Sequence, residues 1–243
     1  MDLQSYLFRI LGWTNSRGVD HALRSLTLAR SRQAALVITG TGDLVGIALS
    51  LHRRAFPPGP FILCDRKRHD TTETVRCPTN IMNPLDAFKA ARHGSLCVRN
   101  HRLPVEFPAV KTMFQDSLCA VRLIVCVSEI INHSHTHALT SVPVPIRVPP
   151  LQERSSRDLD RIVEEYGADA ISTLGVDRLF FAAKDHKWIV ENAATSLTEV
   201  EKAALRLVAI NATGDIVSAA HRLQMSPISL RRWYARREPQ NSY

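Results

Sequence analysis

The chain has 243 residues, of which 45% are hydrophobic and 22% are charged, a composition that excludes a disordered or fibrous protein. Lysine and arginine number 31 against 23 acidic residues, and the formal net charge of +8 favours an anionic partner such as nucleic acid. No apolar run reaches the roughly 18 residues of a membrane span, and the N-terminus lacks the layout of a signal peptide. We therefore expect a cytoplasmic protein of two or three modules without a membrane partner.

Four short apolar runs in the first 150 residues have the pattern of buried strands. They are separated by helix-like or polar segments such as 19–30 and 44–54, and this alternation indicates an α/β fold with a parallel sheet. The runs are continuously apolar, as expected where helices cover both faces of a sheet. The predicted strands span residues 35–39, 60–64, 95–98 and 122–127.

The first predicted strand leads into a turn with the layout of a phosphate-binding loop, LVITGTGDLVGIAL, residues 36–49. Such a loop needs a lysine to reach the β- and γ-phosphates and a Ser/Thr or acidic system to hold magnesium. Asp43 and Leu44 stand in the neighbourhood of that lysine, and the Asp43 carboxylate would repel phosphate. We interpret the turn as a degenerate nucleotide loop that shapes a strand-to-helix connection, with weak nucleotide binding through backbone amides as the alternative. Its residues are Gly40, Thr41, Gly42 and Asp43.

Other chemistry-bearing residues of the first 150 predict neither a metal site nor catalysis. Alternating histidines in HSHTH suit zinc or nickel, but they stand without a carboxylate or cysteine close by. The cysteines include no Cys-x-x-Cys pair and are expected to be buried thiols, and the charged run DRKRHD, residues 65–70, is expected to be a solvated loop. We expect no cofactor, no metal and no enzymatic activity. The histidines are His133, His135 and His137, and the cysteines are Cys64, Cys77, Cys97, Cys119 and Cys126.

The stretch SVPVPIRVPP, residues 141–150, marks a boundary, because its four prolines exclude a helix or a central strand. Beyond it, SSRDLDRIVEEYGADAI has the apolar spacing of a helix. Ser196 or Thr198 can cap a further helix, SLTEVEKAALRLVAINATGD, whose apolar stripe favours packing within the chain over a role in dimer formation.

The segment DIVSAAHRLQMSPISLRRWYARR, residues 215–237, has the spacing of two short helices joined by a tight turn. Ser226 is a natural N-cap, and Pro227 is a natural first residue of the second helix. The expected core between the helices consists of Ala219, Ala220, Leu223, Met225, Leu230 and Trp233. The outward face of the second helix could then enter a DNA major groove, where arginine bonds guanine edges or phosphates; the alternative is a solvated basic helix. The expected DNA-binding residues are Ser226, Ile228, Ser229, Arg231, Arg232 and Arg236.

The segment SAAHRLQMSPISLRRWYARR resembles the Fis-type helix-turn-helix at the C-termini of bacterial enhancer-binding proteins. That family usually has glycine in the turn where this chain has Gln224, and a left-handed residue other than glycine costs about 1 kcal/mol. Further stretches resemble the AAA+ domain of the same family, the activators of the enhancer-dependent sigma factor. ALVITGTGDLVGIALSLHRR, with a matching His52, resembles the strand, phosphate loop and following helix, and VPPLQERSSRDLDRI resembles the segment before the helical lid.

The remaining matches show where this chain departs from the family. SLCV resembles the Walker B strand, but Arg99 and Asn100 follow where the family has its acidic pair. VRLIVCVSE resembles the sensor strand, and the chain between Cys64 and Phe88 has no counterpart of the sigma-contacting Gly-Ala-Phe-Thr-Gly-Ala loop. The resemblance, which covers roughly residues 19–237, thus implies an AAA+-like fold without nucleotide hydrolysis.

These expectations divide the chain into a degenerate AAA+-like α/β domain at 1–150, a helical lid-like module at 151–195 and a Fis-type helix-turn-helix domain at 196–243. The predicted function is that of a nucleoid-associated transcription regulator that binds double-stranded DNA as a homodimer or higher oligomer, with RNA polymerase or an AAA+ relative as further partners. Two alternatives stay open: a module that binds active AAA+ relatives without DNA, and a divergent ATPase that activates the sigma factor.

Overall fold

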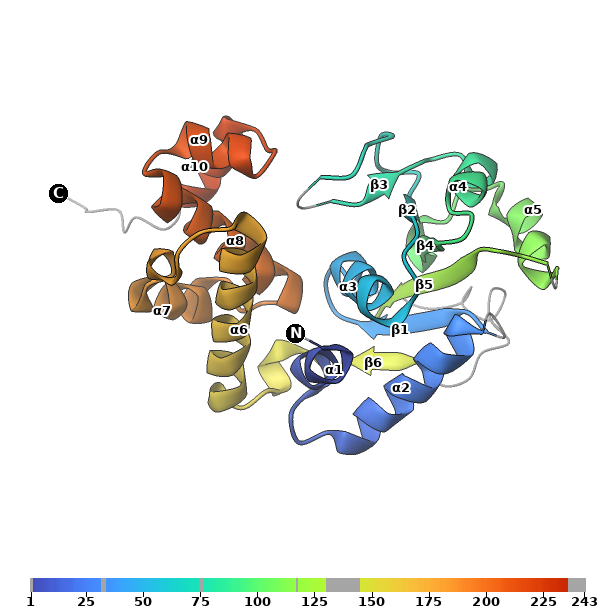
Figure 1. Ribbon diagram of the computed structural model, residues 1–243, viewed down its shortest axis with the longest axis horizontal. Helices are drawn as coiled ribbons and strands as arrows, with labels where there is room; N and C mark the ends of the chain where they lie inside the picture. The colour runs from blue at the N-terminus through green and yellow to red at the C-terminus, as the bar shows by residue number, and fades with distance from the viewer. Residues whose placement is uncertain (1, 32–33, 75–76, 117, 130–144, 236–243) are drawn as a thin grey trace. The chain divides into compact units, whose positions relative to one another are not determined.

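The computed structural model describes residues 2–31, 34–74, 77–116, 118–129 and 145–235. The chain divides into two compact units, Met1–Pro150 and Leu151–Tyr243 (Figure 1). The division falls at the last proline of the stretch 141–150. The regions 151–195 and 196–243 belong to the same unit.

The first unit is built on a parallel sheet, which confirms the predicted α/β class. Its described residues form six strands in the order β3-β2-β4-β5-β1-β6, and every neighbouring pair is parallel. The sequence predicted β1, β2, β4 and β5, whereas β3 and β6 are too short to give an apolar run. The strands are β1 (Leu36–Gly40), β2 (Phe61–Cys64), β3 (Thr79–Asn80), β4 (Ser95–Arg99), β5 (Arg122–Ser128) and β6 (Ile146–Val148).

The proline-rich stretch contributes β6, which lies at the edge of the sheet beside β1. An edge strand tolerates neighbouring prolines because one of its sides needs no ladder hydrogen bonds. The expectation that this stretch forms no central strand is therefore met, and a short edge strand accounts for its alternating Ile146 and Val148, which are both buried.

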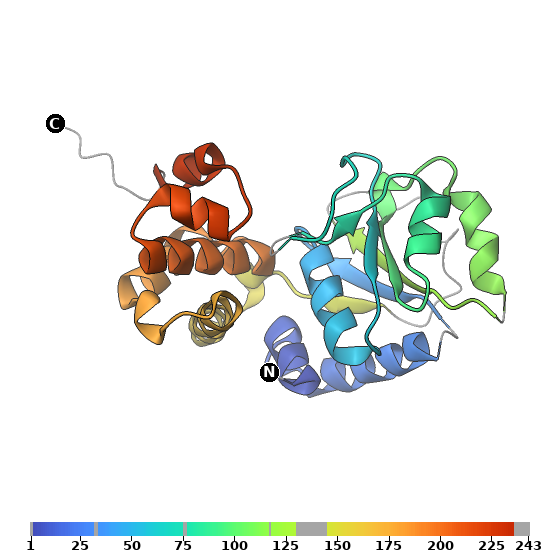
Figure 2. The same cartoon turned by 45° about the horizontal axis from the view of Figure 1, so that its top comes forward.

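Helices cover both faces of the sheet, as the continuously apolar strands predicted. Figure 2 shows α3 on one side of the strands and α4 with α5 on the other. Side chains of β4 alternate between these faces: Leu96 and Val98 join the core that includes Ala87 of α4 and Phe107 of α5. The helices of this unit are α1 (Leu3–Leu11), α2 (Ser16–Arg30), α3 (Val45–Ala55), α4 (Pro84–Ala90) and α5 (Phe107–Lys111), with 3-10 turns η1 (Asn100–Arg102) and η2 (Thr112–Gln115).

All regular secondary structure in the described residues of the second unit is helical. Ser196 caps α8 by accepting a hydrogen bond from the backbone nitrogen of Glu199 at 3.2 Å, as one of the two predicted alternatives required. The helices are α6 (Ser156–Leu174), α7 (Ala183–Asn192), α8 (Leu197–Thr213), α9 (Ile216–Arg222) and α10 (Pro227–Ala235), with 3-10 turns η4 (Leu151–Glu153) and η5 (Arg178–Phe180). None of the helices in the described parts of the chain is long and apolar enough to cross a bilayer.

Helix α8 is the packing centre of the second unit. Ten of its 17 residues are buried, and it contacts α6, α7 and α9. The apolar stripe of α8 is therefore buried within the chain, as the prediction of a packing helix requires. The stripe leaves little apolar area on α8 for a second copy of the protein.

Candidate functional site

Helices α9 and α10 form a two-helix motif joined by residues 223–226. Asp215 caps α9: its Oδ1 accepts hydrogen bonds from the backbone nitrogens of Val217 at 2.9 Å and Ser218 at 2.8 Å. The Ser218 hydroxyl and backbone also bond the Asp215 carboxylate and lower its pKa below the ordinary value. The two helices meet through four fully buried residues of the predicted core, Ala219, Ala220, Leu223 and Leu230.

The turn between the helices contains a left-handed glutamine, as predicted. Gln224 has φ +50°, a region that costs a residue with a Cβ about 1 kcal/mol. The backbone nitrogen of Met225 donates to the carbonyl of Ala220 at 2.9 Å, and that of Gln224 donates to His221 at 3.0 Å. This pair of bonds is a Schellman motif, which satisfies the last carbonyls of α9 and turns the chain toward α10.

The outward face of α10 carries the predicted DNA-binding residues. The described members of that set are all exposed, and Arg231 and Arg232 contribute two exposed basic side chains. Arg236, the sixth member, lies outside the described residues. The exposed members are Ser226, Ile228, Ser229, Arg231 and Arg232.

Trp233 of the predicted core packs against the preceding helices. Its ring meets Trp188 of α7 edge to face, with 5.4 Å between the ring centroids, and the Arg206 guanidinium of α8 lies 4.9 Å from the ring centroid. Trp233 therefore anchors α10 to the preceding helices. Helical spacing could not reveal this role, because Trp188 is remote in sequence.

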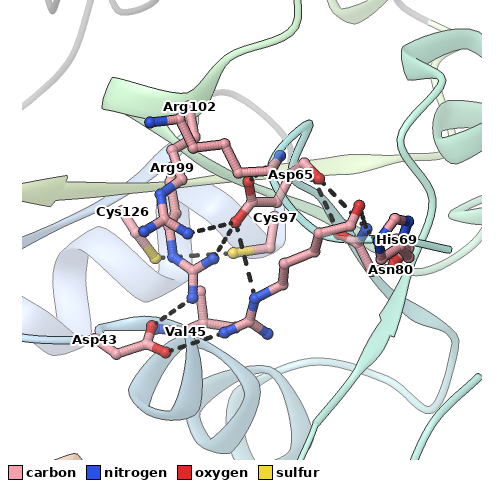
Figure 3. Close-up of polar contacts among 11 residues, drawn as sticks. Asp43, Val45, Asp65, His69, Asn80, Cys97, Arg99, Arg102 and Cys126 are labelled. Atoms are coloured by element: carbon pink, nitrogen blue, oxygen red, sulfur yellow. Dashed lines mark hydrogen bonds and ion pairs between the residues drawn. The ribbon is translucent and has the colours of Figure 1, made fainter. Parts of the chain in front are cut away.

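A second candidate site lies where several strands of the sheet end. Asp43 follows β1, Asp65 follows β2 and Arg99 ends β4. Arg99 Nη2 donates to Asp43 Oδ1 at 2.8 Å, and its Nη1 pairs with Asp65 Oδ2 (Figure 3). Arg102 Nη1 adds a bond of 3.2 Å to Asp65, and Arg68 lies 3.6 Å from Asp43. We call these five residues the strand-end cluster.

The Asp43 carboxylate occupies the start of α3. Its Oδ1 accepts a hydrogen bond from the backbone nitrogen of Val45 at 3.1 Å, which is the kind of contact that a phosphate makes at a helix N-terminus. Burial by itself would raise the Asp43 pKa, but the charge and hydrogen bond of Arg99 outweigh it, so the pKa lies below its ordinary value. Arg99 and Arg68 thus pair with the Asp43 carboxylate.

The glycines of the degenerate loop serve the backbone turn. A Cβ on Gly40 would lie 2.8 Å from the carbonyl oxygen of Val148 in β6, and Gly42 has φ +77°. Glycine avoids both penalties. Gly40, Thr41, Gly42 and Asp43 thus form the expected strand-to-helix connection between β1 and α3.

The prediction of a solvated loop at residues 65–70 is wrong for the first residue, Asp65. Four of the residues from 66 to 70 are exposed, but the Asp65 side chain is fully buried. Its Oδ1 accepts from the backbone nitrogen of Lys67 at 3.0 Å, and burial, which would raise its pKa, is outweighed by this bond and by Arg99 and Arg102. Its position directly after a buried strand could have indicated this, since parallel strands end at one edge of a sheet.

The described residues contain no group of three side chains that could hold a metal ion. His133, His135 and His137 lie outside the part that the structure describes. Burial raises the pKa of the Cys64 thiol to about 12, and the hydrogen bond to Cys126 together with burial raises that of Cys97. Such thiols are poor nucleophiles. Cys77 is exposed, so the prediction of burial was wrong for it.

Comparison of the chain with protein-family models and with curated proteins finds no match. The residues and their geometry are therefore the basis for a function.

Proposed function

We propose that this protein is a DNA-binding transcription regulator that uses α10 as its recognition helix. The observation that carries the proposal is the exposed basic face of α10, held on a buried two-helix core by a tight turn. In a helix-turn-helix, the second helix enters the major groove and its N-terminal residues contact base edges. Arg231 and Arg232 are the candidates for base or phosphate contacts, and Ser226 and Ser229 for phosphate contacts.

In this proposal the first unit is an AAA+-like scaffold without nucleotide chemistry. Strand β5 separates β1 from β4, so one strand lies between the glycine loop and the strand end to which the resemblance assigns the acidic pair. The signs of charge are exchanged: the loop carries Asp43 and the strand end carries Arg99, which bond each other at 2.8 Å. An arginine does not hold magnesium, and an aspartate does not bind a triphosphate.

Binding as a homodimer or higher oligomer is part of the proposal. Helix α10 has nine residues, and one such helix contacts too few base pairs for useful specificity. Two copies on paired half-sites double the contacts. Because the apolar stripe of α8 is buried within its own unit, the proposed dimer surface lies elsewhere on the chain.

Two further hypotheses make different predictions. A module that binds AAA+ relatives, or RNA polymerase, without DNA has no salt-dependent affinity for duplexes. A divergent ATPase turns over ATP, and it would need replacements for a lysine and two acids; the two carboxylates of the strand-end cluster are instead paired with arginine.

The test is fluorescence anisotropy of the full chain on a mixed duplex library across a salt series. We expect affinity to fall with salt at a log-log slope of about −0.9 per phosphate contact. The double variant Arg231→Ala/Arg232→Ala should bind at least about tenfold more weakly with a shallower slope.

The matched control is Arg157→Ala/Arg161→Ala, which removes the same charge from α6. It should bind nearly as the wild type does. An equal loss in both variants would indicate a general charge effect, and absence of binding at low salt would favour the module without DNA.

A further inference from the structure

The recognition face of α10 carries one large apolar side chain. Ile228 is 63% exposed, and the exposed positions around it, apart from Pro227, are serine or arginine. It is the second residue of α10, after Pro227. Arg231 and Arg232 stand three and four residues further on, and these spacings place all three side chains on neighbouring positions of one helix face.

This arrangement fits a thymine in the major groove. Thymine presents a C5-methyl group there, and the other major-groove markers of the base pairs are hydrogen-bond donors and acceptors. A β-branched side chain has few rotamers to lose when it packs against such a methyl group. Two guanidinium groups stand beside Ile228, and in the major groove DNA offers guanine edges and phosphates that bind such groups.

We infer that Ile228 contacts the C5-methyl group of a thymine and thereby selects an A·T pair at one position of the DNA site. Arg231 or Arg232 binds an adjacent base or phosphate. This inference rests on the proposed function, since it needs α10 in the major groove.

The experiment replaces single thymines by deoxyuridine, which removes the methyl group and leaves the base pairing unchanged. Duplexes are first selected by the full-length wild type from a randomised library. Each thymine of the selected duplex is then replaced in turn, and Kd is measured for the wild type and for Ile228→Ala. At one thymine of each half-site, the wild type should lose about fourfold in affinity, the effect of one buried methyl group.

The Ile228→Ala variant tests whether the effect of deoxyuridine depends on this side chain. Ile228→Ala should bind the original duplex more weakly and be insensitive to deoxyuridine at that position, while Leu179→Ala, a truncation of another exposed aliphatic residue of the same unit, should behave as the wild type. Because Ile228 is exposed and alanine favours helix, the variant should keep its fold, which thermal unfolding checks.

Three results would overturn the inference while leaving the proposed function intact: equal deoxyuridine sensitivity in the wild type and Ile228→Ala, a selected duplex without a fixed thymine, or loss of self-association in Ile228→Ala with unchanged deoxyuridine sensitivity. Failure of the wild type to bind any duplex would instead refute the proposed function, and the inference with it.

Discussion

At the level of single residues, His52 shows how a buried side chain fixes its own protonation. It is 4% exposed on α3; its Nε2 lies 3.0 Å from the carbonyl oxygen of Gly59, and its Nδ1 lies 2.9 Å from the Ser95 hydroxyl. A carbonyl only accepts, so Nε2 carries the hydrogen and Nδ1 accepts from Ser95. Burial lowers the His52 pKa, the bond to Gly59 partly opposes this, and the nearby Arg122 lowers it further.

We predict a pH-dependent stability that comes from His52. The folded-state pKa lies below the unfolded value of about 6.5, so the unfolded chain takes up a proton first as the pH falls. The contribution of neutral His52 is complete above that value and is lost as the pH falls toward the folded pKa, by at most about 1.4 kcal/mol per pH unit. Urea unfolding of the wild type and His52→Gln at pH 7.5 and 5 measures it.

Glutamine can make both hydrogen bonds of His52 without titrating. It loses the edge-to-face ring contacts of His52 with Phe56 and Phe61, so His52→Gln should be less stable than the wild type at pH 7.5. Because glutamine does not titrate, the difference should shrink at pH 5. A difference that stays constant between the two pH values would contradict the neutral, buried histidine.

The strand-end cluster shows how pairing changes the role of a single charged side chain. Arg99 is largely buried and bonds Asp43 and Asp65, which approach it from two other strand ends. Each of the three residues in isolation suggests a lost nucleotide site or a solvated loop. In the folded chain they pair with one another, and buried charges require such pairing.

At the level of elements, the turn between α9 and α10 combines a favourable hydrogen-bond pattern with an unfavourable residue. The Schellman bonds of Met225 and Gln224 fix the path of the chain, and this path demands a positive φ at Gln224. Glycine adopts this conformation without strain, whereas a β-branched residue does so at a larger cost than glutamine.

We predict that Gln224→Gly raises the free energy of unfolding by about 0.5 kcal/mol, because relief of strain exceeds the extra chain entropy of glycine. Gln224→Val should lower it by about 1 kcal/mol. Urea unfolding of the three proteins measures both changes.

Gly214 offers the matched reverse substitution. It has φ +75° at the end of α8, and a Cβ added there would meet open space, so Gly214→Ala should cost about 1 kcal/mol through backbone strain alone. A loss of stability in Gly214→Ala together with a loss in Gln224→Gly would show that the Gln224 side chain makes contacts that outweigh its strain.

At the level of the whole molecule, the chain consists of two compact units that meet in sequence at Pro150. Each has its own core: the first packs helices on both faces of the parallel sheet, and the second packs α6, α7 and α9 around α8. A unit with a core of its own can in principle fold alone.

We therefore predict that a fragment of residues 151–243 folds independently, with helical circular dichroism and a cooperative thermal transition. If α10 alone contacts DNA, the fragment keeps all direct DNA contacts. Its affinity for DNA should then fall below that of the full chain only if dimerisation needs the first unit. Sedimentation of the fragment beside the full chain measures that dependence, and a fragment without cooperative unfolding would contradict two autonomous cores.

Pattern along the chain was enough to predict the parallel α/β class, the four longer strands and the boundary at Pro150, and the resemblance to the Fis-type motif indicated the left-handed turn at Gln224. These features arise from local pattern and local backbone geometry, which neighbouring residues specify. Three other features required the folded chain. Asp65 and Asp43 share Arg99, Trp233 packs on Trp188, and the short strands β3 and β6 pair with β2 and β1 at the two edges of the sheet. Those contacts join residues distant in sequence, and their energy exists only once the fold has brought the partners together and removed water from between them.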